Sequence, residues 1–302
     1  MRFSIFQDSR QGDRQGNEDR VGYSYSRDVL LMTIADGMGG HQDGEVAAEL
    51  AITEITRRFQ QEARNKLRKP SEFLVSAIQS AHRAIVSHAV AHNLLECPRT
   101  TIVACIVQNG GAYWAHAGDS RLYVLRNGQL VAATQDHSRV QMMIKSGEIT
   151  PEMAARHPER NKIFSCLGGV VPPQIANSRE FPLQTGDTIV LSTDGFWAQI
   201  PPNILGSMLK KQPLVELFPG LLNEAHRRAR GESDNLSVVA MMWENQEDAR
   251  VADTQNMEED FASSSNTTQQ LDVPGMADED VTEDDIERAI NEIQEAIRRV
   301  PR

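Results

Sequence analysis

Residues 29–41 read VLLMTIADGMGGH, and the interpretation of the whole chain starts from this stretch. The apolar and β-branched run at 29–35 predicts a buried strand. That run ends at Asp36, and Gly37, Gly39 and Gly40 follow almost immediately. A carboxylate at the end of a buried strand, beside glycines that let backbone groups approach closely, is typical of a turn or of an ion-binding loop.

The bulk composition is that of a globular protein. The chain has 302 residues, of which 40% are apolar, so a large core can be buried. No run approaches the roughly 18–20 apolar residues of a membrane span, and the start, MRFSIFQDSRQG, lacks the apolar region of a secretory signal. Its three cysteines form no CxxC pair or His/Cys cluster. We therefore expect no disulfide framework, no zinc site and a reducing, cytoplasmic location.

The net charge of −11 is concentrated in the C-terminal part of the chain. Residues 244–302 contain 17 Asp and Glu against 5 Lys and Arg, whereas residues 1–243 contain 25 against 26. A nearly neutral body gives no electrostatic reason to expect a nucleic-acid partner. The composition predicts a folded domain at 1–243, an acidic disordered linker at 244–280 and an amphipathic helix at 281–300.

The predicted C-terminal helix has one apolar stripe, formed by Ile286, Ile290, Ile293, Ile297 and Val300. An isolated helix of this length is only marginally stable in water. The stripe therefore predicts docking on the chain's own folded domain or on a partner. The alternative is a solvated extension without a docking role.

In the folded domain, short apolar runs alternate with turn signals. We expect strands at 29–35, 101–107, 112–117, 188–193 and 236–243. A hairpin is expected at 121–133, with its turn at Asn127-Gly128. The segments 45–67 and 72–92 have apolar residues at helical spacing. This pattern predicts an α+β body in which helices cover the faces of sheets.

Acidic residues recur at the ends of these apolar runs, next to glycine or another small residue. They are Glu18, Asp19, Asp36, Asp119, Asp194 and Asp234. Any one of them is most simply a turn residue. Several carboxylates gathered at the strand ends of one sheet would repel one another unless cations neutralised them. Because oxygen-only ligands favour Mg²⁺ or Mn²⁺, the residues themselves favour a carboxylate metal site over a set of unrelated turns.

Six motifs, in their order along the chain, resemble the metal-dependent PPM (type-2C) protein serine/threonine phosphatases, especially the bacterial branch. They are Arg14-x-x-x-Glu18-Asp19, DGMGGH (36–41), AHAGDSRLYVLR (115–126), DHS (136–138), LSTDGFW (191–197) and SDNLSVV (233–239). The resemblance covers about residues 1–243. It implies an α+β fold with a central β-sandwich of two antiparallel sheets flanked by helices.

The resemblance also implies a site for two Mn²⁺ or Mg²⁺ ions, with a third bound more weakly. Asp36 would bridge the two ions, and the carbonyl of Gly37 would bind the second. Asp194 and Asp234 would complete the first metal. Glu18 would serve the second metal, directly or through a water.

Other roles follow from the same resemblance. Asp119, with Asp194, would hold the third ion. Arg14 would clamp the substrate phosphate, because its planar guanidinium matches two phosphate oxygens. Asp19 would support the site from beside the ligands. Met38 stands where some relatives carry a histidine that is proposed as general acid, which leaves the proton donor open between a metal-bound water and His41.

The implied function is hydrolysis of phosphoserine or phosphothreonine on proteins by a metal-activated water. From what is typical of the family, we expect a signalling role in which the enzyme opposes a bacterial Ser/Thr kinase. Arg121 is expected to fix the Asp119 loop, and 139–165 corresponds to the family's variable flap. The alternatives are a pseudophosphatase that binds phosphoproteins and a hydrolase of small phosphate esters. We expect no membrane partner.

Overall fold

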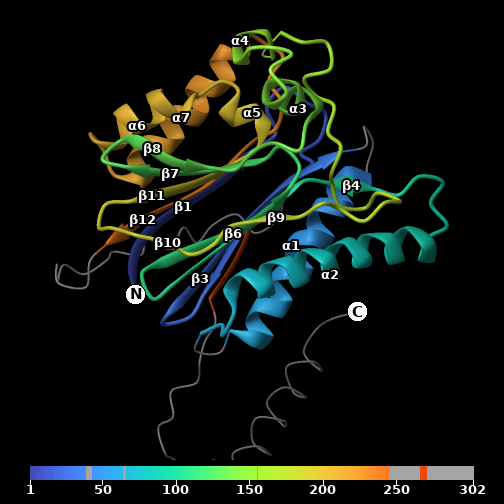
Figure 1. The fold of residues 1–302 in the computed structure, drawn as a ribbon, viewed down its shortest axis with the longest axis horizontal. Coiled ribbons are helices and arrows are strands. Elements are labelled where there is room, and N and C mark those ends of the chain that lie inside the picture. Colours follow the sequence, from blue (N-terminus) through green and yellow to red (C-terminus); the bar gives the residue numbers. More distant parts are fainter. Residues whose placement is uncertain (39–42, 64–65, 155, 245–265, 271–302) are drawn as a thin grey trace, which may run out of the picture. The chain divides into compact units, whose positions relative to one another are not determined.

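Two β-sheets lie face to face, and each carries helices on its outer side (Figure 1). The computed structural model describes residues 1–38, 43–63, 66–154, 156–244 and 266–270. All of the described residues fall in the compact unit Met1–Leu271. The predicted β-sandwich of antiparallel sheets flanked by helices is confirmed.

The first sheet has the strand order β1-β12-β11-β7-β8, and all of its pairs are antiparallel. Its strands are β1 (Arg2–Arg10), β7 (Arg121–Arg126), β8 (Gln129–Ala133), β11 (Thr188–Ser192) and β12 (Leu236–Glu244). Strands β1 and β12 pair from Arg2 opposite Glu244 to Arg10 opposite Leu236. The first strand of the chain, β1, is therefore paired along its whole length with β12, which comes last in the sequence among the strands of this sheet.

The second sheet has the order β10-β6-β5-β3-β2-β13. Its main strands are β2 (Asp19–Tyr25), β3 (Val29–Met38), β5 (Ile102–Gln108) and β6 (Gly111–Ala117). The short strands are β4 (Arg99–Thr100), β9 (Ala176–Asn177), β10 (Phe181–Pro182) and β13 (Asn266–Gln270). Strand β4 pairs with the end of β3, and this pairing lies beside the site described below.

The central strands are apolar on both sides because both of their faces are covered. In β3, Leu30 and Met32 pack in the core between the two sheets. Their neighbours Val29 and Leu31 point the other way, into the core beneath the helices. Side chains of a strand alternate between its faces, so only a continuous apolar run fills both cores. This requirement explains the run at 29–35.

Each outer face has its own helices. Helices α1 (Asp43–Glu62) and α2 (Pro70–Ala91) cover the second sheet. Helices α5 (Asp194–Trp197), α6 (Pro202–Leu209) and α7 (Leu214–Arg228) cover the first. The predicted flap contains the short helices α3 (Arg139–Lys145) and α4 (Pro151–Ala154). Among the described helices, none has the length and apolarity needed to span a membrane.

The sequence predicted the central elements better than the peripheral ones. The Asn127-Gly128 turn joins β7 to β8, and both residues have positive φ, 51° and 71°, as this type of tight hairpin requires. Strands β1 and β2 and helices α6 and α7 were not predicted. In α7 the apolar spacing is interrupted by Pro219, a helix-breaking signal that the packed helix nevertheless accommodates.

One segment differs from the predicted disordered linker. Residues Asn266–Gln270 form strand β13, which pairs in parallel with β2. Without it, β2 would be an edge strand with unpaired backbone groups, and such an edge accepts an additional strand. The rest of the linker beyond Glu244, and the predicted helix at 281–300, lie outside the described residues.

The contact of α7 with the sheet predicts a strong effect of Phe218 on stability. Phe218 is fully buried and stacks on Phe6 of β1, with ring centroids 5.4 Å apart. We expect Phe218→Ala to lower the free energy of unfolding by about 3–5 kcal/mol, because it removes buried surface and leaves a cavity. Val215, on the same helix, is 58% exposed. Val215→Ala should change it by less than about 0.5 kcal/mol. Urea unfolding followed by circular dichroism measures both, and equal effects would contradict this packing.

Candidate metal centre

The predicted ligands lie where strands of both sheets begin or end. Asp36 lies near the end of β3, and Glu18 immediately precedes β2. Strands β2 and β3 are antiparallel with Asp19 opposite Asp36, so these residues share one edge of the second sheet. In the first sheet, Asp194 follows β11 and Asp234 precedes β12, and these strands are also antiparallel neighbours. Antiparallel pairing therefore gathers residues that are far apart in sequence.

Asp119 lies in the connection between the two sheets, next to the aspartates of both. It lies between β6 of the second sheet and β7 of the first, and it is only 6% exposed. Burial and, next, the charge of Asp194 raise the pKa of Asp119 to about 8. Burial and the charge of Asp234 raise the pKa of Asp194 to about 6. These carboxylates therefore lie close enough to disfavour one another's ionisation.

The pKa of Asp36 is raised by several neighbouring carboxylates together. Burial raises the pKa of Asp36 well above its ordinary value. Other carboxylates raise it further, and they are Asp19, Asp194, Asp119 and Asp234. We call these aspartates, together with Glu18, the carboxylate cluster. The structure thus brings the acidic residues singled out in the sequence into one region.

Asp19 is almost completely buried, with 1% exposure. Its Oδ2 accepts a 2.8 Å hydrogen bond from Thr193 Oγ1, and Thr193 directly precedes Asp194. Burial raises the pKa of Asp19 to about 7, although hydrogen bonds from Ser237 and Thr193 oppose the shift. Through Thr193, Asp19 fixes the start of the turn that carries Asp194.

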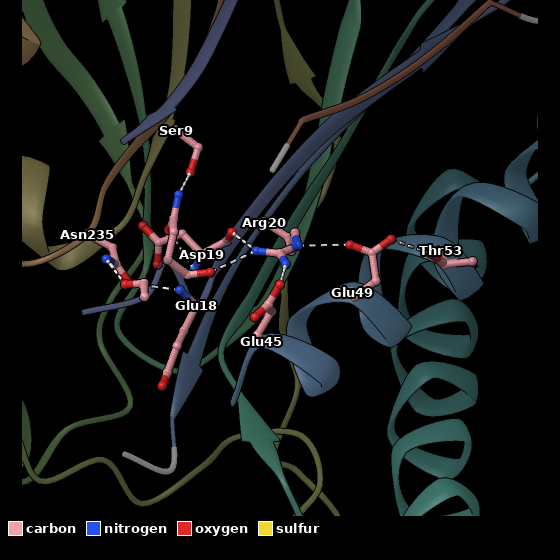
Figure 2. Close-up of polar contacts among 10 residues, drawn as sticks. Ser9, Glu18, Asp19, Arg20, Glu45, Glu49, Thr53 and Asn235 are labelled. Atoms are coloured by element: carbon pink, nitrogen blue, oxygen red, sulfur yellow. Dashed lines mark hydrogen bonds and ion pairs between the residues drawn. The ribbon is translucent and has the colours of Figure 1, made fainter. Parts of the chain in front are cut away.

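Asn235 joins the loop before β2 to the loop before β12. Its Oδ1 accepts a 2.9 Å hydrogen bond from Glu18 N, and its Nδ2 donates to the carbonyl oxygens of Gln11 and Gly16. Its backbone N donates to Asp234 Oδ1 at 2.9 Å. Figure 2 shows Asn235 beside Glu18. Asn235 thereby sets the position of two predicted ligands at once.

Gly37 and Gly44 leave no room for side chains. A Cβ on Gly37 would lie 2.3 Å from the carbonyl oxygen of Gly44 and 2.7 Å from that of Glu18. A Cβ on Gly44 would lie 2.4 Å from Glu18 Oε2. Gly37 N also donates to Glu18 O at 3.2 Å. Glu18 and Gly37, both predicted to serve the same ion, are therefore held next to each other by close backbone packing.

Two threonines hold the backbone of Asp36. Thr101 N and Thr100 Oγ1 each donate a 2.9 Å hydrogen bond to Asp36 O, and Asp36 N donates to Thr101 Oγ1 at 3.0 Å. Thr101 Oγ1 lies 2.7 Å from Ser120 Oγ, and Ser120 is next to Asp119. These bonds fix Asp36 relative to the Asp119 turn.

Arg121 holds the Asp119 turn from the other side. It makes two 2.8 Å hydrogen bonds to the carboxylate of Asp136, and its guanidinium lies 3.4 Å from the centre of the Trp197 ring. Trp197 Nε1 donates to Asp119 O at 3.0 Å. The expectation that Arg121 fixes this loop therefore has a geometric basis.

Arg14 contacts the carboxylate cluster directly. Its Nη2 lies 2.6 Å from Asp234 Oδ2, and its side chain is 61% exposed. The hydrogen bond and charge of Asp234 raise the pKa of Arg14. The predicted phosphate-binding arginine thus lies at the solvent side of the cluster. A cation bound by Asp234 would weaken this pairing and leave the guanidinium available to an anion.

Arg20 is a supporting residue that the sequence interpretation missed. It is 8% exposed, and its Nη1 donates to the carbonyl oxygens of Asn17 and Asp19. Its other nitrogens pair with Glu45 and Glu49 of α1 (Figure 2). The spacing of these glutamates by one helical turn was visible in the sequence, but their common partner was not. Arg20 ties the start of β2 to the start of α1.

The donor set fits hard divalent cations. The cluster offers carboxylate oxygens, to which the sequence prediction adds the backbone carbonyl of Gly37. The raised pKa values arise from burial and mutual repulsion, both of which a bound cation relieves. Within the described part of the chain, no three carboxylate, imidazole or thiol side chains already form a ligand shell. Carboxylates without a cation repel one another, so we expect their side chains to converge on binding.

The sandwich and its carboxylate edge form the architecture that the sequence resemblance implied for a phosphatase. Residues 7–239 match the protein phosphatase 2C family. The serine/threonine phosphatase stp of Listeria welshimeri is 32% identical over 237 residues, covering 78% of this chain and 93% of that protein.

Solved structures of serine/threonine phosphatases are also similar to this chain. The serine/threonine phosphatase of S. agalactiae has a TM-score of 0.74 and 27% identity, covering 80% of this chain and 100% of that one. The catalytic domain of the phosphatase PstP, solved with two manganese ions, has a TM-score of 0.68 and 30% identity, covering 80% and 99%. The chain belongs to the protein phosphatase 2C family, and its predicted enzyme class, protein serine/threonine phosphatase, is confirmed.

The carboxylate cluster predicts that the metal-free protein loses stability as the pH rises. The pKa values of Asp19 and Asp119 are raised to about 7 and about 8, against about 3.9 in an unfolded chain. In this range the folded state binds more protons than the unfolded state, so the free energy of unfolding falls with rising pH. We expect a lower Tm in EDTA at pH 8.5 than at pH 6.5. Mn²⁺ should raise the Tm more at pH 8.5.

His137 acts in the opposite sense but mostly below this window. Burial lowers its pKa to about 4, against about 6.5 in an unfolded chain, so its effect is nearly complete by about pH 7. Asp119→Asn should reduce the loss of Tm between pH 6.5 and 8.5. Glu216→Gln, an exposed change on α7, should leave the loss unchanged. A metal-free Tm that rises over this window would contradict the role of the cluster.

Proposed function

We propose that the protein hydrolyses phosphoserine and phosphothreonine on other proteins, in a reaction that depends on Mn²⁺ or Mg²⁺. The carboxylate cluster carries this proposal, because its members raise one another's pKa in the absence of a cation. Cations favour the ionised carboxylates and so suit this site. The two manganese ions in the PstP structure support a site for two cations.

The residues that would hold the cations are those inferred from the sequence. They are Glu18, Asp36, the carbonyl of Gly37, Asp119, Asp194 and Asp234. When bound, the cations supply a water of lowered pKa and offset negative charge on the phosphoryl group. A third, weaker ion would involve Asp119 and Asp194.

The remaining tasks fall to side chains of this chain. Asp19 and Thr193 orient the turn of Asp194 through their 2.8 Å hydrogen bond. Arg14, at the solvent side of the cluster, would bind two phosphoryl oxygens and stabilise the charge that develops on them. Met38 cannot donate a proton to the leaving oxygen, and His41 lies outside the described residues.

The proposed partners are phosphorylated proteins and a cognate Ser/Thr kinase, whose phosphorylation of those proteins the enzyme would reverse. The proposed location is the cytoplasm. The helix at 281–300 would dock on the folded domain or on a partner. A phosphoprotein-binding scaffold is less well supported, since no carboxylate implied by the family resemblance is missing from the sequence.

The direct test is phosphate release from a phosphothreonine peptide with Mn²⁺, with Mg²⁺ and with EDTA. We expect release only with a divalent cation. Asp194→Ala should lower kcat/KM by more than the roughly 10- to 100-fold that is typical of losing a residue that only supports a ligand. Folded protein that binds metal but releases no phosphate would instead indicate the scaffold.

We expect both the planar geometry and the charge of the Arg14 guanidinium to contribute to phosphate binding. Arg14→Ala should lower kcat/KM roughly 10- to 100-fold, because a hydrogen bond to a charged group contributes about 1.5–3 kcal/mol. Arg14→Lys keeps the charge but loses the planar pair of donors, so we expect an intermediate loss. Arg227→Ala, an exposed change on α7, is the matched control. Equal kcat/KM for Arg14→Ala and Arg227→Ala would exclude phosphate binding by Arg14.

A further inference from the structure

A pocket of about 290 Å³ has in its lining Met38, which lies two residues beyond Asp36 of the carboxylate cluster. Its lining comes from segments that are far apart in the sequence. Met38, Glu96 and Arg99 contribute one part, and Asn161 and Ile163 of the flap contribute the other. No role was assigned to this pocket or to Arg99 from the sequence.

The pocket shares a wall with the proposed metal centre. Strand β4 pairs with β3, with Arg99 opposite Met38 and Thr100 opposite Gly37. Thr100 Oγ1 in turn donates to the carbonyl oxygen of Asp36. A side chain in the pocket therefore lies next to the strand pair that carries the predicted bridging ligand.

Backbone hydrogen bonds hold both walls in place. Thr100 and Leu167 exchange two of them, at 3.3 Å and 2.9 Å. Phe164 N donates to His137 O at 2.9 Å. The flap residues of the lining lie next to these bonds, so the pocket is formed before any ligand binds, as is usual for small binding sites.

Arg99 gives the pocket its specificity for charge. Its side chain is exposed, and within the described part of the chain this side chain makes no hydrogen bond or ion pair. The lining thiols of Cys97 and Cys166 have their pKa raised by burial, so they are neutral walls and not nucleophiles. Glu96 also lines the pocket, so its negative charge offsets that of Arg99 and weakens the preference for an anion.

We propose that this pocket receives a side chain close in sequence to the phosphorylated residue of a protein substrate, and that Arg99 selects Asp or Glu there. The inference rests on the proposed function. An extended peptide advances about 3.3 Å per residue, so a neighbouring side chain reaches a pocket that borders the reaction centre. Free phosphate esters have no such side chain, so the pocket would favour peptides over them.

The test uses full-length protein and phosphothreonine peptides that differ only by Glu or Gln at one position, from two residues before to two after the phosphothreonine. The readout is the Glu/Gln ratio of kcat/KM, which cancels any general loss of activity. For the natural sequence we expect a ratio of about five at one position, the size of one partly screened charge pair. Arg99→Ala should bring that ratio to about one.

Three variants sharpen the result. Arg99→Lys should keep part of the ratio, and Glu96→Gln should increase it, since it removes the opposing charge. Arg227→Ala on α7 should leave it unchanged. A ratio near one at every position, or a ratio that survives in Arg99→Ala, overturns the proposal.

The design separates this inference from the proposed function. If the protein with Mn²⁺ hydrolyses none of the peptides, the proposed function fails. The same ratio is then measured as dissociation constants of fluorescently labelled peptides. Tighter binding of the Glu peptide that is lost in Arg99→Ala would still support the pocket, and equal dissociation constants would overturn it.

Discussion

Mutual repulsion among buried carboxylates is the constraint on which the arrangement of this protein depends. Asp19, Asp36, Asp119 and Asp194 all have their pKa raised by burial and by the charges of neighbouring carboxylates. Left to themselves, such groups would move apart or into water. They stay together because the two sheets fix the backbone on either side of each aspartate, and the sheets are in turn rigid because their central strands are buried on both faces.

The contacts around the cluster divide this task among groups that bind no ion themselves. Thr100 and Thr101 hold the backbone of Asp36, and Asn235 holds the loops before β2 and β12. Arg20 and Arg121 act farther out, each through a carboxylate partner. Because Thr100, Thr101 and Asn235 bind backbone atoms of Asp36 and Glu18, they fix where these two side chains begin and leave their carboxylates free to turn toward a cation.

Local signals predicted the centre of the fold. The stretch VLLMTIADGMGGH contained both the two-sided burial of β3 and the carboxylate at its end, and Asn127-Gly128 specified its hairpin. What could not be predicted depends on pairing between distant segments. Glu45 and Glu49 are one helical turn apart, but no local signal in the sequence indicates that both pair with Arg20. Strand β13 lies in a polar tail, and its pairing follows from the open edge of β2 and not from its own composition.

The same constraint explains why the arginines around the cluster differ in exposure. An arginine that only supports the frame, such as Arg20, can be buried with its partners. An arginine that recognises a ligand must remain accessible, and both Arg14 and Arg99 are exposed. Arg14 keeps a carboxylate partner that a bound cation would compete for, whereas Arg99 has none in the described part of the chain. The proposed phosphate recognition at Arg14 would therefore be coupled to cation binding, and the proposed recognition of a neighbouring side chain at Arg99 would not.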